Sequence, residues 1–438
     1  MKRRLQYLIF PFLLATIGVR SQERQWETVP SQLDKQSQLK TNEDPEYNYG
    51  SRTLPSPRAE AVTWSDPKGC LYIFGGIGLD ENKQWGIFRD MWRYDPVDNN
   101  WKLISGDRNS VIINGNEPAD KPSPRRDGST WVDPDGNLWL YGGRYLADLY
   151  HLDDMWKFDI KTSNWTKVSG KALFNQLEIR GDKKSPTAEN YPGSRSKASS
   201  WTDKNGNLWL FGGIAYKPET EGKNDYFSDL WMFETSSNRW QWVSGASKPN
   251  LPIGYDKKNP SSKDNSPTPR ASSATWYDQE KNQLWLYGGM GYDSSANDLG
   301  ALSDLWFYDI ATDIWKRQMG ESELNKALTL SSAGPEHAHN HPGYRVSALT
   351  WTGKNGDLFL AAGQSSFSHK MIYIEKNVWI YSLKSGYWRI LPQNDISVIG
   401  SGSSFSDKEN NLYMFGGKEF DRATLQSRPS NSVRKIKL

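Results

Sequence analysis

The chain has 438 residues and a nearly balanced charge, with 54 Lys and Arg residues against 51 Asp and Glu residues. No long basic or acidic run occurs, which argues against a nucleic-acid partner. Cys70 is the only cysteine, and this excludes a disulfide framework and a zinc site built from cysteines. The 21 tryptophans can build a core in this otherwise polar sequence, because each buried aromatic ring removes roughly 150–250 Å² from water.

The first residues predict a secretory signal peptide, residues 1–21. Basic residues at positions 2–4 precede an apolar run at 8–17, and Val19 and Ser21 suit positions −3 and −1 of a cleavage site. The apolar run is shorter than the roughly 20 residues that cross a bilayer, and an uncleaved anchor is the alternative. Cleavage takes the net charge from +3 to −1, because four positive charges leave. We therefore predict a mature chain, 22–438, that is secreted or extracellular (periplasmic or surface-located in a bacterium) and has no membrane span.

A repeat follows along the rest of the chain. An apolar run ends in a pair of glycines five times, and Ala362-Gly363 holds the same place in a sixth copy. An aromatic residue precedes each pair by 11 or 12 residues: Trp64, Trp131, Trp201, Trp276, Trp351 and Phe405. Two tryptophans spaced by nine residues follow five of the pairs: Trp92 and Trp101, Trp156 and Trp165, Trp231 and Trp240, Trp306 and Trp315, Trp379 and Trp388. Equal spacing in every copy indicates a structural repeat.

Each copy is predicted to form four short strands, a to d. In the second copy, strand a carries Trp131, strand b is Leu138–Tyr141, strand c is Asp154–Phe158 and strand d is Trp165–Val168. Turn-forming residues such as Asp135-Gly136-Asn137 separate the strands, because Gly and Asn tolerate positive φ. No stretch shows a sustained helical period.

These motifs resemble the kelch repeat, whose copies fold as four-stranded blades of a β-propeller. The resemblance covers about residues 22–438 and implies an all-β, six-bladed kelch propeller as a single domain. The sixth copy ends after Asn431–Arg434, where strand c is expected, and Trp26–Val29 matches strand d of the second copy. We therefore predict that an N-terminal strand completes the last blade, which removes two exposed strand edges.

The lengths of the loops predict that one face of the propeller carries the binding site. The d–a connections are long, polar and rich in Pro, Ser and Lys, and the b–c connections vary, whereas a–b and c–d are nearly constant. In a four-stranded blade the b–c and d–a connections emerge together, so one face carries the variable loops. Loops on a rigid scaffold commonly bind partners, although long loops can also be solvated padding.

Five arginines recur six residues before the strand-a aromatic, and the sixth copy has Ile399 there: Arg58, Arg125, Arg195, Arg270 and Arg345. In kelch proteins similar to this one, arginines at this position often line the central pocket. Guanidinium groups suit carboxylates, so these arginines are predicted to bind a ligand at the channel mouth, and that ligand can be acidic. The alternative is structural, with each arginine paired to an acid or carbonyl of a neighbouring blade.

Further site predictions concern histidine, aspartate and asparagine residues. His337, His339 and His341 alternate in a long loop as weak candidates for a metal site, against a solvated loop as the alternative. Four aspartates two residues before the strand-c Trp are predicted to cap turns: Asp90, Asp154, Asp229 and Asp304. Asn164-Trp165-Thr166 is a glycosylation sequon, relevant in a eukaryotic secretory pathway. No cofactor is predicted.

Two classes of function remain open. The first is a secreted, monomeric binding module for a protein or carbohydrate, similar to the kelch domains of the attractin group but without their disulfide-rich modules. The second is a carbohydrate-active enzyme such as a sialic-acid mutarotase or epimerase, which needs a carboxylate beside arginines. A copper oxidase of the galactose oxidase type fits poorly, since Cys70 is the only thioether donor. The sequence favours the binding module, because no catalytic constellation stands out.

Overall fold

The computed structural model of the chain consists of strands and turns throughout its described part. The residues that it describes are 27–29, 53–82, 84–106, 109, 120–145, 149–171, 173–217, 224–251, 255–256, 258–260, 262–293, 298–320, 324, 336, 340–364, 377–391, 398–421 and 426–436. Within these ranges no helix is long and apolar enough to span a membrane. The predicted signal peptide lies outside them.

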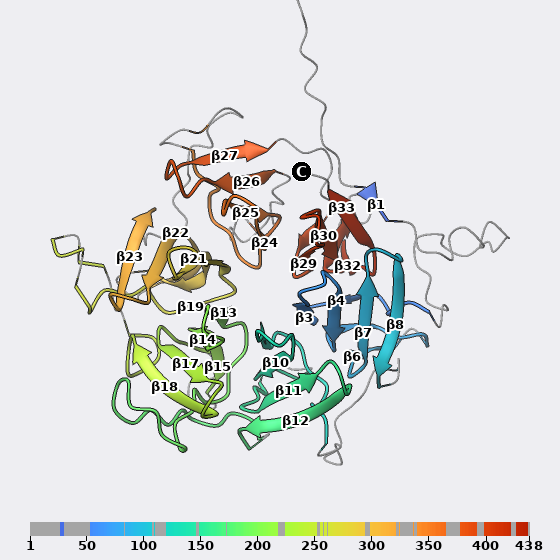
Figure 1. Cartoon of the computed structure of the whole chain (residues 1–438), viewed down its shortest axis with the longest axis horizontal. Helices are drawn as coiled ribbons and strands as arrows, with labels where there is room; N and C mark the ends of the chain where they lie inside the picture. The colour runs from blue at the N-terminus through green and yellow to red at the C-terminus, as the bar shows by residue number, and fades with distance from the viewer. Residues whose placement is uncertain are drawn as a thin grey trace, which may run out of the picture.

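Six antiparallel sheets lie around a common centre, one for each copy of the repeat (Figure 1). We call them blades one to six in chain order. Blade one has β3 (Val62–Ser65), β4 (Leu71–Phe74), β7 (Met91–Asp95) and β8 (Asn100–Ser105). Blade two has β9 (Ser129–Val132), β10 (Leu138–Tyr141), β11 (Met155–Asp159) and β12 (Asn164–Ser169). Blade three has β13 (Ser199–Thr202), β14 (Leu208–Phe211), β17 (Leu230–Glu234) and β18 (Arg239–Ser244).

The other three blades follow the same plan. Blade four has β20 (Ala274–Asp278), β21 (Gln283–Tyr292), β22 (Leu299–Asp309) and β23 (Ile314–Met319). Blade five has β24 (Leu349–Thr352), β25 (Leu358–Ala361), β26 (Val378–Tyr381) and β27 (Trp388–Leu391). Blade six has β29 (Ser403–Ser406), β30 (Leu412–Phe415), β33 (Val433–Ile436) and β1 (Glu27–Thr28). The predicted all-β, six-bladed architecture is confirmed, and the predicted strands b, c and d of blade two correspond to β10, β11 and β12.

The strand-a tryptophans join neighbouring blades. Each is buried between two sheets, and its indole N–H donates to a strand-b carbonyl of the next blade, as from Trp64 to Trp139 at 2.7 Å and from Trp131 to Trp209 at 2.9 Å. Trp201, Trp276 and Trp351 repeat this bond. Blade six has Phe405, which lacks this donor and packs instead against Tyr94 of blade one with ring centroids 6.0 Å apart. The repeated aromatic therefore holds the blades in register as well as filling the core.

The sixth blade takes its outer strand from the opposite end of the chain. β1 pairs antiparallel with β33, and Glu27 lies opposite Lys435. The predicted pairing of an N-terminal strand with the last blade is thus found, with strand c starting at Val433 instead of Asn431; Trp26 lies outside the described residues. Blades one and six also share an apolar core, in which the rings of Trp101 and Phe415 lie 4.9 Å apart.

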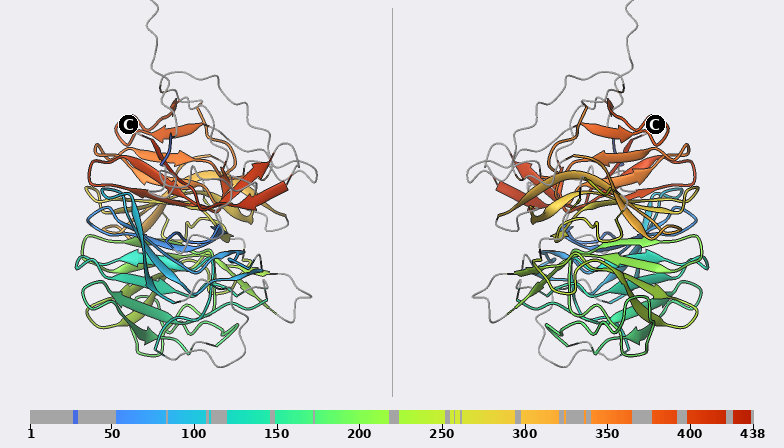
Figure 2. Two further views of the ribbon diagram at one scale, coloured as in Figure 1. Left: turned by 90° about the vertical axis from the view of Figure 1, so that its right-hand side faces the viewer. Right: turned by 90° about the vertical axis from the view of Figure 1, so that its left-hand side faces the viewer.

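Short hairpins extend several b–c connections beyond the blades, a feature that the repeat pattern did not predict. They are β5 (Ile77–Leu79) with β6 (Trp85–Ile87), β15 (Ile214–Tyr216) with β16 (Asn224–Tyr226), and β31 (Lys418–Asp421) with β32 (Gln426–Pro429), while in blade four β21 and β22 continue as one long hairpin. Three segments just before strand a pair with these extensions: β2 (Arg58–Ala59), β19 (Arg270–Ala271) and β28 (Val398–Gly400). The hairpin β31–β32 projects from one side of the disc (Figure 2). The face formed by b–c and d–a connections, which we call the loop-rich face, therefore carries a second layer of small sheets.

Candidate functional site

The five repeated arginines are buried, each with at most 2% of its surface exposed. Four of them bind an aspartate of their own blade through two hydrogen bonds of 2.6 to 3.1 Å: Arg58 with Asp90, Arg125 with Asp154, Arg195 with Asp229, and Arg270 with Asp304. Arg345 donates to the carbonyl of Tyr344 at 2.7 Å. Asn377 replaces the aspartate in blade five.

The four aspartates are the centres of these buried contacts, so the prediction that they cap turns is wrong. In blade two, Asp154 also accepts the indole N–H of Trp156 at 2.6 Å, and Arg125 donates to the carbonyl of Gly142 at 3.0 Å. Burial alone raises the pKa of Asp154, but the charge and hydrogen bonds of Arg125 outweigh it and lower the pKa. The carboxylate therefore joins the start of strand a to the start of strand c.

Four of the arginines that were predicted to bind a ligand are already paired with aspartates. Their guanidinium groups are also shielded from solvent. This arrangement corresponds to the alternative in which the arginines have a structural role. Their partners lie in the same blade, however, and not in a neighbouring one. A ligand would have to displace a buried carboxylate to reach them, at a large desolvation cost. Ligand binding by these arginines stays a prediction that the geometry does not favour.

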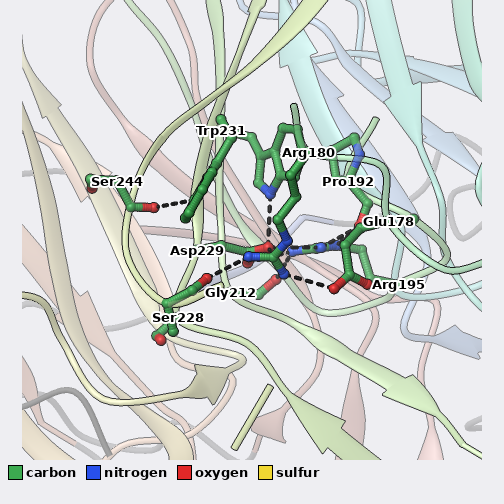
Figure 3. A network of polar contacts seen from close by, with 12 residues as sticks. Glu178, Arg180, Pro192, Arg195, Gly212, Ser228, Asp229, Trp231 and Ser244 are labelled. Atoms are coloured by element: carbon green, nitrogen blue, oxygen red, sulfur yellow. Dashed lines mark hydrogen bonds and ion pairs between the residues drawn. The ribbon is translucent and has the colours of Figure 1, made fainter. Parts of the chain in front are cut away.

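A second arginine reaches the pair in blade three (Figure 3). Arg180 comes from the d–a connection between blades two and three, and its Nη2 lies 2.8 Å from Glu178 and 3.3 Å from Asp229. Its guanidinium carbon also lies 5.3 Å from the ring centre of Trp242. Arg180 lies outside the repeat, so no pattern in the sequence marks it. Its contacts anchor this long connection to the blade.

The channel mouth on the loop-rich face is formed by six other residues, one per blade, which lie two positions after each arginine or its Ile399 equivalent. They all have φ between 54° and 59°: Glu60, Asp127, Lys197, Ser272, Ser347 and Ser401. Backbone N–H groups donate to the preceding blade, for example Glu60 to Ser401 and Asp127 to Glu60, both at 3.0 Å. Non-glycine residues keep such φ values only where their surroundings hold them. Here the inter-blade hydrogen bonds do so.

One side of this mouth is charged. We define the mouth cluster as Glu60, Arg126, Asp127, Arg144, Lys197 and Lys418. Glu60 contacts Arg126, and it lies 3.3 Å from both Arg144 Nη2 and Lys418 Nζ. Asp127 accepts from Arg144 Nε at 2.7 Å. Burial raises the pKa of Glu60, but the four surrounding cations outweigh it and hold the pKa well below its usual range.

We expect Glu60 to make the protein sensitive to acid. Because its folded pKa lies below the unfolded value of about 4.3, its stabilisation is complete above that value and is lost as pH falls toward the folded pKa. Glu60→Gln should cost about 2 kcal/mol at pH 7, because charge-assisted hydrogen bonds are lost. The variant should then lose less further stability than wild type between about pH 5 and pH 2.

Denaturant unfolding of wild type, Glu60→Gln and Glu280→Gln across pH measures this difference. Glu280 is an exposed residue of the a–b turn in blade four and serves as the control. If the free energies of unfolding of wild type and Glu60→Gln depend on pH in the same way, Glu60 does not contribute to the acid sensitivity.

Exposed apolar side chains lie in two connections of the loop-rich face, the b–c connection of blade two and the d–a connection that follows this blade. We call them the blade-two patch: Leu149, Tyr150, Leu173, Leu177 and Ile179, each 42 to 76% exposed. The two connections contact each other. Asn175 donates to the carbonyl of Leu149 at 2.7 Å, and the rings of Tyr150 and Phe174 lie 5.1 Å apart.

The longer of these connections is fixed to blade three. Lys184 N–H donates to the carbonyl of Trp242 at 2.8 Å, and Thr187 bridges to Trp240, so the connection runs along the edge of β18. The blade-two patch therefore stands on an anchored loop. The loop lengths predict binding on this face, but these five residues follow no period that would mark them in the sequence.

Of the remaining predicted site residues, the structure describes His341 and Asn164. His341 is largely buried, its Nδ1 accepts the N–H of Gly343 at 3.0 Å, and burial followed by the Arg345 charge lowers its pKa to about 4. His337 and His339 lie outside the described residues. In the part of the chain that the structure describes, no three His, Cys, Asp or Glu side chains are placed to hold a metal ion. Asn164 is exposed at the start of β12.

Residues 38–176 match the family model of the KLHDC2/KLHL20/DRC7 Kelch-repeats domain. The mouse Kelch domain-containing protein 1 is 22% identical over 398 residues, which are 83% of this chain and 79% of that protein. Tip elongation aberrant protein 3 of Schizosaccharomyces pombe is 24% identical over 221 residues, 47% of this chain and 17% of that protein. N-acetylneuraminate epimerase 1 of Escherichia coli is 22% identical over 218 residues, 47% of this chain and 52% of that protein.

Proposed function

The chain belongs to the kelch-repeat proteins, and from this premise we propose that it is a protein-binding propeller whose partner docks on the loop-rich face. The blade-two patch is the observation that carries the proposal. Large apolar side chains that cluster in solvent commonly mark protein interfaces. The patch stands on loops that are anchored by hydrogen bonds, so little ordering cost accompanies binding.

We place this interaction outside the cytoplasm. The support is the signal-like segment 1–21, with its basic start, short apolar run and small residue at position 21. The partner in this proposal is an exported or surface protein that presents apolar side chains.

A sugar-acid epimerase is the second candidate, because the mouth cluster places two carboxylates beside two arginines. The relative named N-acetylneuraminate epimerase 1 gives it a precedent among similar proteins. However, general bases work best with a pKa near the working pH, and the cations around Glu60 lower its pKa. Binding therefore has the stronger support.

The protein-binding proposal predicts a strong effect of two substitutions in the patch. In Leu173→Asp/Leu177→Asp, two exposed apolar groups become charged, so partner affinity should fall at least about 30-fold, in line with hot spots worth 2 kcal/mol or more. The folded state should be unaffected, because both side chains are largely exposed. The measurement is affinity capture from the native extracellular or envelope fraction, followed by a titration with the captured protein.

Val97→Asp is the matched control, since Val97 is 71% exposed in a c–d turn on the opposite face. Equal capture by wild type and the Leu173/Leu177 variant, with loss only in Val97→Asp, contradicts docking on the loop-rich face.

A further inference from the structure

A cavity of about 320 Å³ lies in the central channel, at the end formed by the a–b turns. We call it the channel pocket. Six hydroxyl side chains from five blades line it: Ser65, Ser200, Thr275, Thr350, Thr352 and Ser406. It is therefore at the opposite end of the channel from the mouth cluster and the loop-rich face.

The alternation of strand a produces this lining. In β20, Trp276 is buried between the blades, whereas Thr275 and Tyr277 are half-buried on the other side of the strand. The same alternation in β24 buries Trp351 and leaves Thr350 and Thr352 toward the channel. Because strand side chains alternate between two faces, the residues between the core aromatics must face the axis.

Some channel hydroxyls have a structural task. Strand a is the inner edge of each blade, and its unpaired carbonyls need donors. Ser200 Oγ donates to the carbonyl of Thr130 at 3.0 Å, and Ser404 Oγ donates to the carbonyl of Thr350 at 3.0 Å. Among the described residues, the side-chain oxygens of Thr275, Thr352 and Ser406 make no such bond.

The pocket is also uncharged, since none of its described lining residues carries an ionisable side chain other than Tyr277. The hydroxyl of Tyr277 is already engaged, because it lies 2.7 Å from Asn282 Oδ1 and accepts the N–H of Lys204 at 2.8 Å. Its ring thus contributes apolar surface. A charged ligand would lose its hydration here without an opposite charge in return.

We propose that the channel pocket binds a neutral, polyhydroxylated small molecule of monosaccharide size. Each Ser or Thr hydroxyl can both donate and accept a hydrogen bond, which matches the hydroxyls of a sugar or cyclitol. The volume is at the lower end of the range for ligand pockets, which limits the ligand to roughly one sugar ring. This site is independent of protein docking on the loop-rich face.

The test is a calorimetric titration of the mature protein with D-glucose, D-galactose and myo-inositol, and with the charged probes D-gluconate and D-glucosamine. At least one neutral probe should bind saturably with one-to-one stoichiometry, and both charged probes at least tenfold more weakly. In Thr275→Val/Thr350→Val, affinity should fall at least tenfold, because the shape is kept and two hydroxyls are lost. Valine also has a high β-strand propensity, so the variant should fold.

Thr130→Val is the matched control, since Thr130 holds the Thr275 position in blade two and does not line the pocket. Its affinity should equal that of wild type. The proposal is overturned if no neutral probe binds with a Kd below about 10 mM. It is equally overturned if the Thr275/Thr350 variant binds as well as wild type, or if the charged probes bind as well as the neutral ones.

Discussion

A chain that lacks residues 22–30 is expected to fail to fold into a soluble, cooperative unit. Without β1, the outer edge of β33 loses the strand that pairs with it in the described part of the chain, and blade six is left with three of its four strands. Exposed edges promote aggregation, and a propeller depends on each blade packing against its neighbours. Size-exclusion chromatography and denaturant unfolding of chains that begin at residue 22 and at residue 31 measure the difference.

Moving the same nine residues to the other end provides the control. In a chain that starts at residue 31 and carries residues 22–30 directly after Leu438, Trp26 follows Ile436 by seven residues. Trp165 follows Phe158 by the same distance in blade two, where Phe158 occupies the position of Ile436 in the sheet. This rearranged chain should regain folding. A chain starting at residue 31 that unfolds with the cooperativity and midpoint of the longer chain would falsify the role assigned to β1.

Arg270→Met is expected to destabilise the protein by about 3–5 kcal/mol, because it leaves the buried carboxylate of Asp304 without its bidentate partner. Arg270 also donates to the carbonyls of Thr268 and Gly288, which would lose these bonds. Urea or guanidinium unfolding at pH 7 measures the loss.

Two further variants separate the buried pair from a general effect of removing an arginine. Arg270→Met/Asp304→Leu removes both charges and should recover a large part of the lost stability, since an apolar pair carries no buried charge. Arg239→Met replaces an exposed arginine of β18 and should change stability by less than about 0.5 kcal/mol. If Arg270→Met behaves like Arg239→Met, the repeated arginines are not structural.

Much of the fold could be predicted because each repeated residue has a local reason. The first glycine of the pair in blade two illustrates this. Gly142 has φ +61°, and a Cβ there would lie 2.4 Å from the carbonyl oxygen of Arg195 in blade three. A side chain at this position of blade two would clash with that oxygen, so the glycine marks both the end of strand b and the contact with the next blade. The nine-residue spacing between the tryptophans of strands c and d also has a local cause, because these two strands pair with each other.

The arginines show where residue patterns alone were insufficient. The recurrence of Arg125 and that of Asp154 are both visible in the sequence, where they suggest two separate roles, a ligand site and a turn cap. They lie 29 residues apart in the chain, and only the sheet brings the start of strand a beside the start of strand c. A residue type suited to carboxylate ligands is equally suited to a buried aspartate.

The blade-two patch could not be predicted for a different reason. Leu149 and Leu177 belong to two connections without any hydrophobic period, so nothing in their spacing relates them. The two connections meet because Asn175 donates to the carbonyl of Leu149, and Lys184 fixes the second connection to β18. The mouth cluster likewise combines Glu60 with residues from three other blades.

Site-specific photo-cross-linking tests the central claim of docking on the loop-rich face most directly. A photoreactive amino acid at Leu177 and another at Val97 place equal probes on opposite faces of the same disc. Docking on the loop-rich face predicts that the Leu177 probe forms a covalent adduct with one exported protein in native extracts, and that the Val97 probe does not. Adducts with that protein from Val97 alone would contradict it.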